Sequence, residues 1–194
     1  MAVYDRFARF YDRLFAPFES RFLRAWRKES LAELPTGADI LELGCGTGAN
    51  FELYPPFRRA VSTELSKKMI DIAVGRSCGS ALLQADAQHL PFPANSFDAA
   101  FATLVFCSIP DPNAAFSELR RVLRPNGTVI LLEHVRPPGI AGRLFDVLNI
   151  ATTALIDDHF NRQTADLAKT AGLEVKEVRK KAGGIVNLIV CRNV

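Results

Sequence analysis

The stretch ILELGCGTGANF, residues 40–51, decides the fold of this 194-residue chain. An apolar run meets Glu42, glycines follow at positions 44, 46 and 48, and a polar segment opens after them. A buried strand that runs into such a loop and then into a short helix is typical of nucleotide-binding α/β sheets. Glycines in the loop let the backbone approach a ligand where a β-carbon would collide with it.

Strands and helices alternate on the carboxyl side of this loop. Short helices are expected from about Ala49 and after Ser66, which can cap a helix, and longer ones near 110–123 and 162–171. Such alternation with short apolar strands predicts a parallel sheet covered on both faces. The expected strands are 38–43, 59–64, 80–86, 97–106, 128–135, 173–180 and 184–192.

The two closing strands are joined by KAGG, residues 181–184, which suffices for a hairpin but is too short for a parallel crossover. We therefore expect an α/β fold with a doubly wound, mostly parallel seven-stranded sheet and a C-terminal antiparallel strand. Apolar residues recur at helical spacing over 2–33, which predicts an N-terminal helical cap broken near Pro17. The length favours one domain: cap 1–36, core 37–135, insert 136–161, and closing helix and hairpin 162–194.

Composition argues against several classes of function. The net charge of +3 at pH 7 is too small and diffuse to favour nucleic acid as a ligand. No apolar run is long enough to span a membrane, and the charged N-terminus lacks the apolar core of a signal peptide. The four cysteines, Cys45, Cys78, Cys107 and Cys191, fit no zinc spacing. All but Cys78 lie in apolar surroundings and are expected to be buried thiols, which favours a reducing cytoplasm.

The glycine loop fits two kinds of cofactor. Gly44, Gly46 and Ala49 satisfy G-x-G-x-x-A, which is typical of a dinucleotide site. Gly44, Gly46 and Gly48 also satisfy G-x-G-x-G, with Glu42 two residues before the first glycine. A carboxylate would repel the pyrophosphate of a dinucleotide but attract a cofactor that carries an ammonium and a sulfonium and no phosphate. Glu42 therefore favours the second interpretation.

The G-x-G-x-G loop with its acid resembles class I S-adenosylmethionine-dependent methyltransferases, over about residues 38–135. LPFPANSFDAAFATLVFCSI and ELRRVLRPNGTVILLEHV are similar to the small-molecule subgroup that contains ubiquinone/menaquinone C-methyltransferases. GANFELYPP, TLVFCSI, LLEHV and DDHFNR are similar to thiol S-methyltransferases, and the N-terminal Y-D pattern to bacterial phospholipid N-methyltransferases. Two departures from the family are Glu64, where aspartate is commoner, and Asn126, where glycine is usual.

The resemblance implies a Rossmann-like sheet, S-adenosyl-L-methionine as cofactor and S-adenosyl-L-homocysteine as its product. It implies that Glu42 faces the cationic amino-acid part, directly or through water, and that Glu64 accepts hydrogen bonds from both ribose hydroxyls. Asp86 would accept from the adenine amino group while the Ala87 amide donates to a ring nitrogen. The expected cofactor-binding residues are Tyr11, Glu42, Gly44, Cys45, Gly46, Thr47, Gly48, Glu64, Leu65, Met69, Asp86, Ala87 and Thr103.

Methyl transfer from a sulfonium has a neutral leaving group, so the protein mainly aligns the nucleophile and excludes water. A general base is needed only when the acceptor must lose a proton. The candidates are His134, at the end of a strand, and His159, which follows Asp157 and Asp158.

The acceptor site is expected between the N-terminal helices, the loop after the fourth strand and the insert. Apolar residues at 140–156 favour a small lipophilic acceptor, whether a thiol, an amine or a ring carbon, although a plain core helix explains them equally well. Tyr4 and Tyr11 are candidates to close over the cofactor, and simple helix packing is the alternative.

Other classes of function stay open at this point. A Rossmann-type oxidoreductase would bind a nicotinamide dinucleotide, and a non-catalytic module would bind the cofactor without transferring its methyl group. Nucleic-acid methylation has no support, because TLVF stands where an N-P-P-Y-type tetrad would follow the fourth strand. The expected partners are a small-molecule acceptor, no nucleic acid, and a membrane only by peripheral contact. A monomer and a homodimer are both compatible with the sequence.

Overall fold

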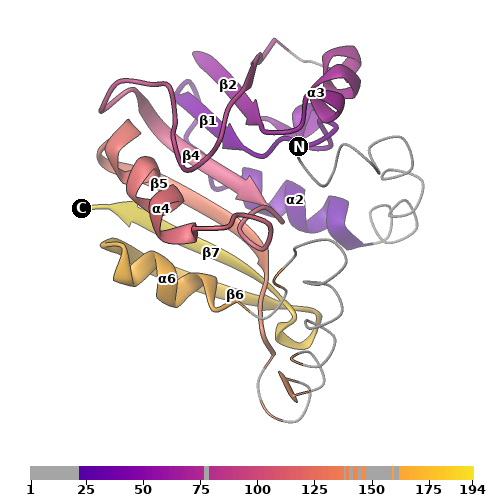
Figure 1. Cartoon of the computed structure of the whole chain (residues 1–194), viewed down its shortest axis with the longest axis vertical. Helices are drawn as coiled ribbons and strands as arrows, with labels where there is room; N and C mark the ends of the chain where they lie inside the picture. The colour runs from indigo at the N-terminus through magenta and orange to yellow at the C-terminus, as the bar shows by residue number, and fades with distance from the viewer. Residues whose placement is uncertain are drawn as a thin grey trace.

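The computed structural model describes residues 22–76, 79–137 and 162–194, together with Gly139, Gly142, Arg143, Asp146 and His159. These residues form a seven-stranded sheet in the order β3-β2-β1-β4-β5-β7-β6, drawn in Figure 1. The strands are β1 (Asp39–Leu43), β2 (Arg59–Glu64), β3 (Ala81–Gln84), β4 (Phe97–Thr103), β5 (Leu123–His134), β6 (Leu173–Lys181) and β7 (Val186–Asn193). The helices are α2 (Arg24–Leu31), α3 (Lys67–Ala73), α4 (Pro112–Val122) and α6 (Thr164–Thr170), with short 3-10 turns η3 (Phe51–Leu53), η4 (Val74–Arg76) and η5 (Ala182–Gly184).

The sheet has the expected mixed topology. β3, β2, β1, β4 and β5 are parallel, and β7 runs antiparallel to both β5 and β6. The hairpin between β6 and β7 turns through Ala182, Gly183 and Gly184, whose φ angles are 47°, 67° and 92°. Two of these three residues are glycines, which adopt positive φ at little energetic cost because they lack a β-carbon. The α/β prediction with a C-terminal antiparallel strand is confirmed.

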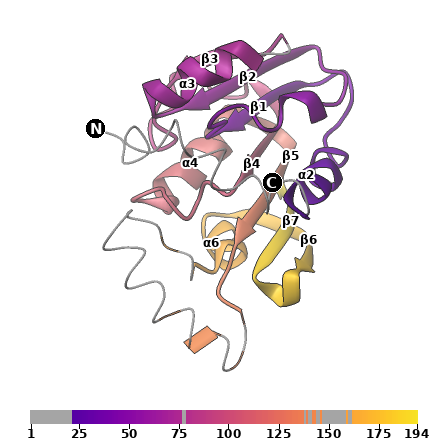
Figure 2. The same cartoon turned by 90° about the vertical axis from the view of Figure 1, so that its right-hand side faces the viewer.

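Alternate residues of the central strands enter two different cores, as the two-residue period of a strand requires. Leu41, Ala100 and Leu131 join the core that contains Phe116 of α4 and Ala168 of α6. Figure 2 shows these two helices on one side of the sheet and α2 on the other. Neighbouring strand residues therefore face opposite layers, which is why the strands read as continuous apolar runs in the sequence.

The second core lies between the sheet and α2. Ile40, Phe101 and Ile130 pack there with Leu23 and Leu31. All five residues of β1 are buried, so the strand that ends in the glycine loop lies at the centre of the molecule. The loop is thus carried by the most enclosed element of the sheet.

Several boundaries differ from the sequence expectation; β3, for example, ends at Gln84 rather than at 86. Three differences have a visible cause. β4 ends at Thr103 rather than at 106, because Leu104 turns into the left-handed region with a φ of 59°. β5 begins at Leu123 rather than at 128, directly after α4, and a bulge opposite Phe97 absorbs the extra residues. The helix expected from about Ala49 is only the 3-10 turn η3, since Pro55 and Pro56 follow it and cannot continue a helix.

Local signals at the helix ends are confirmed. The Ser66 hydroxyl accepts from the Met69 amide at the start of α3, and the Asp111 side chain accepts from the first amides of α4. Asn126 has a φ of 64°, the left-handed turn that its place in RPNG requires. The break near Pro17 lies outside the described residues, as does nearly all of the insert 136–161.

Along the described ranges no helix combines the length and the apolar character that crossing a membrane requires.

Candidate active site

The carboxyl ends of β1, β2, β4 and β5 meet at one edge of the sheet, and the glycine loop leaves from that edge. All three glycines of the loop have positive φ angles, but the space around their α-carbons differs. A β-carbon on Gly44 would lie 2.7 Å from the Val105 methyl carbons, and one on Gly48 would lie 2.5 Å from the Phe51 ring. A β-carbon on Gly46 would meet no protein atom within 4 Å. Gly44 and Gly48 therefore serve packing, whereas Gly46 leaves the backbone accessible to a ligand.

Glu64, at the end of β2, is tied to the glycine loop. Its carboxylate accepts from the Gly46 amide at 3.0 Å and from the Ser66 amide at 2.8 Å. The acid is therefore held in place by backbone donors on both sides. This arrangement brings the carboxylate next to the open glycine, and a shared ligand for the two stays a prediction.

Glu42 lies in a buried polar network rather than at the surface of the site. Its side chain is 1% exposed and accepts from the Asn50 amide at 2.5 Å and from the Tyr54 hydroxyl. The Tyr54 hydroxyl also lies 2.8 Å from the Ser62 hydroxyl. Burial raises the pKa of the Glu42 carboxyl above its usual range, although these hydrogen bonds and the nearby Arg27 charge oppose the shift.

Arg27 links helix α2 to this network. Its guanidinium donates to the Asn50 side-chain oxygen at 3.0 Å and to the Thr103 hydroxyl at 2.5 Å, and Asn50 also donates to Thr103 at 2.9 Å. Sequence reasoning missed Arg27, Asn50 and Tyr54. Arg27 could have been found, because it lies four residues from Leu23 and from Leu31 and therefore falls on the buried stripe of its helix.

Two further predicted residues, Thr47 and Cys45, lie in the loop itself. Thr47 is buried, and its hydroxyl and carbonyl accept from Arg76 at 3.2 and 3.3 Å. Cys45 is a buried free thiol whose pKa is raised, first by burial and then by the charges of Glu42 and Glu64. The side chains of Cys107 and Cys191 are also buried thiols outside any disulfide, and burial raises the pKa of Cys191 to about 12.

Leu65 and Met69 follow Glu64 and differ sharply in exposure. Leu65 is 50% exposed, whereas Met69 is 3% exposed inside α3. An exposed leucine directly after the Glu64 carboxylate offers an apolar face to a flat ring.

Asp86 lies beyond the end of β3 and is bound to its own loop. It accepts from the Gln88 amide at 2.9 Å and from the Gln88 side chain at 2.9 and 3.1 Å. His89 Nδ1 lies 4.0 Å from the Asp86 carboxylate. Ala87 is partly buried against the core on the α4 side. An adenine contact by Asp86 stays a prediction.

The other side of the site is built from the post-β4 loop, which we define as residues 104–110. Glu133 of β5 is fully buried and accepts from the Val105 and Phe106 amides at 3.0 and 3.2 Å. Arg162 donates to the Phe106 and Ile109 carbonyls, the latter at 2.6 Å. Sequence reasoning also missed both residues, although an acid inside the apolar run VILLEHV was a visible signal for Glu133.

The two candidate bases lie at this side of the site. The His159 amide donates to the Cys107 carbonyl at 2.9 Å, which joins His159 to the post-β4 loop. His134 is half-buried at the end of β5. Asp157, Asp158 and Tyr11 lie outside the described residues, so the partnership of His159 with its acids and the tyrosine contact stay predictions.

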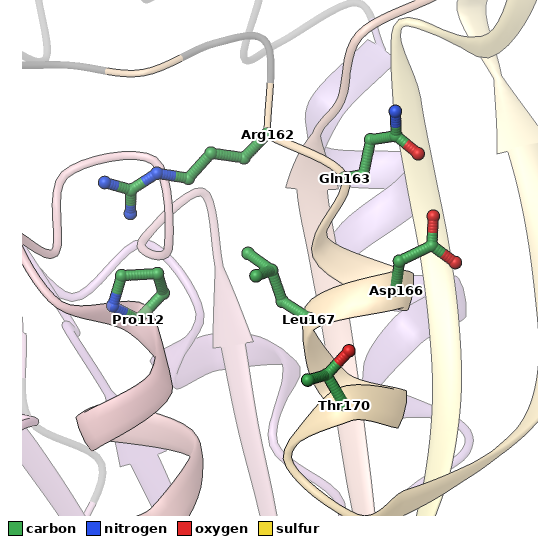
Figure 3. A pocket seen from close by; sticks show the side chains of 6 residues that line it. All are labelled: Pro112, Arg162, Gln163, Asp166, Leu167 and Thr170. Atoms are coloured by element: carbon green, nitrogen blue, oxygen red, sulfur yellow. The ribbon is translucent and has the colours of Figure 1, made fainter.

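A shallow pocket of about 530 Å³ opens between the start of α4 and helix α6. Figure 3 shows Arg162 reaching from the residues before α6 toward the chain that leads into α4. The pocket borders the post-β4 loop and not the glycine loop; it is lined by Pro112, Arg162, Gln163, Asp166, Leu167 and Thr170.

Comparison with known proteins agrees with this geometry. A family model described as a methyltransferase domain matches residues 41–131. The chain is 32% identical to thiol S-methyltransferase TMT1B of Rattus norvegicus over 148 residues, which are 71% of this chain and 61% of the relative. It is 28% identical to the ubiquinone/menaquinone biosynthesis C-methyltransferase UbiE of Hahella chejuensis over 79% of this chain and 67% of the relative. The matched segments thus span about three fifths of the human and rat thiol methyltransferases, 55% and 61% of their lengths.

A solved structure supports the same fold. The crystal structure of a SAM-dependent methyltransferase of Thermotoga maritima matches with a TM-score of 0.76 at 23% identity, over 99% of this chain and 98% of that one. Because the family model covers the glycine loop and the strands around it, these matches identify residues 41–131 as a methyltransferase domain and support a class I S-adenosylmethionine-dependent methyltransferase, with S-adenosylmethionine as the methyl donor.

Proposed function

We propose that the protein transfers the methyl group of S-adenosylmethionine to the thiol of a small lipophilic molecule. The observation that carries this proposal is the apolar post-β4 loop, to which the backbone amide of His159 is hydrogen-bonded at the Cys107 carbonyl. Thiol methylation needs an apolar binding surface and a group that takes the thiol proton, since the thiolate is the nucleophile. The 32% identity to a thiol methyltransferase supports the same acceptor class.

We propose that the cofactor lies along the edge formed by Gly46, Glu64 and Leu65. The fixed Glu64 carboxylate would accept from the ribose hydroxyls, and the exposed Leu65 would cover one face of the adenine. Thr103 and the polar network of Glu42 would meet the amino-acid part. When bound, S-adenosylmethionine supplies a methyl group already activated by a sulfonium with a neutral leaving group.

In the proposed step, the protein's own residues remove one proton and align the two reactants. The imidazole of His159, or of His134, takes the proton from the acceptor thiol. Bound S-adenosylmethionine would supply the methyl group to the resulting thiolate sulfur, with its own sulfur leaving as a neutral thioether. The post-β4 loop aligns the two reactants and excludes water.

A labelled-donor assay tests the acceptor class. The protein is incubated with methyl-labelled S-adenosylmethionine and, in turn, a small aromatic thiol, a matched amine and a hydroquinone, and the products are identified by mass spectrometry. We expect label on the thiol sulfur. Label only on the hydroquinone ring would show that the acceptor atom is a ring carbon and not a thiol sulfur. That outcome would agree with the 28% identity to a quinone C-methyltransferase.

A histidine series tests the base. We expect His159→Asn to lower thiol turnover while the affinity for S-adenosylhomocysteine is unchanged, and His134→Asn serves as the comparison. Equal turnover of both variants and the wild type on a thiol would remove both histidines from the mechanism. A wild-type protein that binds S-adenosylhomocysteine but methylates no acceptor would favour a non-catalytic module.

Three further predictions belong to this proposal. They are a cytoplasmic location, a peripheral membrane contact by residues 140–156, and a division into cap, core, insert and closing hairpin.

A further inference from the structure

We propose that Glu133 and Arg162 are positioning residues that hold the post-β4 loop between the donor and the acceptor, with Glu133 acting on the cofactor side and Arg162 on the acceptor side. The inference rests on the proposed methyl transfer. Both residues are hydrogen-bonded to the post-β4 loop, whose Val105 packs against Gly44 of the glycine loop. Their effect passes through the backbone of residues 105–109.

The Glu133 carboxylate controls where Val105 lies. A single oxygen of this fully buried side chain accepts both the Val105 and the Phe106 amide. The residue before them, Leu104, has a φ of 59°, a conformation that a leucine adopts only when its surroundings hold it there. Charge-assisted bonds from a buried carboxylate are strong enough to do this.

Val105 transmits the position of this loop to the cofactor loop. Its methyl groups occupy the space directly over the Gly44 α-carbon, so that a β-carbon there would lie only 2.7 Å from them. Displacing Val105 would therefore change the packing of the residue that begins the glycine loop. Glu133 is in this way connected to cofactor binding without touching the cofactor.

Arg162 holds the opposite end of the same loop. Its guanidinium donates to the Phe106 and Ile109 carbonyls, and the nearby His159 amide donates to Cys107. Figure 3 shows the Arg162 side chain extended across the upper rim of the pocket toward this loop. The residues that follow the insert are thus fastened to the apolar loop on which we place the acceptor.

The test for Glu133 uses a matched pair of variants. Glu133→Gln keeps the shape and removes the charge; Glu118→Gln does the same to a carboxylate that accepts the Leu90 amide, away from the loop. We expect Glu133→Gln to speed hydrogen exchange at Val105 and Phe106 and to raise the dissociation constant of S-adenosylhomocysteine about three- to tenfold, measured by calorimetry. Glu118→Gln should speed exchange at Leu90 alone and leave that constant unchanged.

The test for Arg162 also uses a matched pair. Arg162→Lys and Arg121→Lys each remove a guanidinium that donates to two backbone carbonyls, Arg121 to those of Phe92 and Leu90. The Ser108 amide donates to the Val105 carbonyl at 3.0 Å, within the loop that Arg162 holds. We expect Arg162→Lys to speed exchange at this amide and to raise the KM for the thiol acceptor about three- to tenfold, with the KM for the methyl donor unchanged. Arg121→Lys should alter neither constant.

Several results would overturn the inference. Equal dissociation constants for the two glutamine variants would show that Glu133 is only structural. A rise in the donor KM instead of the acceptor KM would overturn the role of Arg162, as would unchanged exchange at Ser108. If the wild type methylates no acceptor, the proposed function fails, while the calorimetry and the exchange at Val105 and Ser108 still decide whether these residues position the loop.

Discussion

Strand β1 carries an acid near each end, and the two acids lie in opposite surroundings. Asp39, at its start, accepts two hydrogen bonds of 2.8 Å from Arg58, and this pairing lowers its pKa to about 2. Glu42, near its end, is bound by Asn50 and Tyr54, and burial raises its pKa. A carboxylate therefore stabilises the fold at one edge of the sheet, whereas at the other edge its burial carries a desolvation penalty.

The difference extends along both edges. At the amino-terminal edge Asp39 and Asp98 are surrounded by Arg58, Arg59 and Arg124, which tie together the starts of β1, β2, β4 and β5. At the carboxyl edge the acids Glu64 and Glu133 are held by backbone amides. Opposite charges neutralise one edge. At the other edge both carboxylates are fixed in position, and Glu64 lies beside the open Gly46, where it can interact with a ligand.

The largest expected effect is at the carboxyl edge. Glu64→Gln should weaken S-adenosylhomocysteine binding about a hundredfold, because two hydrogen bonds from ribose hydroxyls lose their charged acceptor. The midpoint of thermal unfolding should change little, because the glutamine oxygen can still accept one of the two backbone amides. Calorimetric titration and thermal melts measure the two effects. A variant that binds as tightly as the wild type would contradict the assignment of Glu64 to the ligand.

The next effect is at the amino-terminal edge. Asp39→Asn should lower the free energy of unfolding by about 2 kcal/mol, because Arg58 and its neighbours lose their shared charged partner. The affinity for S-adenosylhomocysteine should stay within about twofold of the wild type. Urea titration and calorimetry check both values. A large loss of affinity in this variant would break the separation between the two edges.

A glycine pair sharpens the comparison. Gly37, before β1, has a φ of 69°, and Gly46 has a φ of 56°; a β-carbon at either would meet no protein atom within 4 Å. Gly37→Ala and Gly46→Ala should each cost about 1 kcal/mol of stability, from the positive φ alone. Only Gly46→Ala should also weaken cofactor binding. Equal affinities for the two variants would place the ligand away from Gly46.

The smallest expected effect is a difference in pH dependence. Asp39 has a lowered pKa in the folded state, so its contribution is present above its unfolded pKa of about 4 and is lost as the pH falls toward 2. Glu42 has a raised pKa, so its contribution is present below its unfolded pKa of about 4.3 and is lost as the pH rises through the folded value.

Urea titrations at several pH values measure this difference. Relative to the wild type, Asp39→Asn should lose less stability in acid, and Glu42→Gln should gain stability as the pH rises above about 5. Slopes of the same sign for both variants would show that the two ends of β1 do not differ electrostatically.

Much of this fold was already determined by the sequence. Short apolar strands alternate with capped helices, and strand periodicity, the Ser66 and Asp111 caps and the short KAGG link each depend on neighbouring residues alone. The glycine spacing with Glu42 indicated the cofactor family for the same reason, since one strand and one loop contain the whole pattern. Such local signals survive in the sequence because no distant contact is needed to create them.

The tertiary structure decided which side chains share the site. Arg27, Asn50, Thr103 and Glu42 come from four separate segments, and only packing of α2 against the sheet brings them within hydrogen-bonding distance. Burial likewise decided the direction of the Glu42 pKa shift, because desolvation depends on everything that surrounds the carboxylate rather than on its neighbours in the chain. The ends of β4 and β5 were set by the turn at Leu104 and the bulge opposite Phe97, which are features of the assembled sheet.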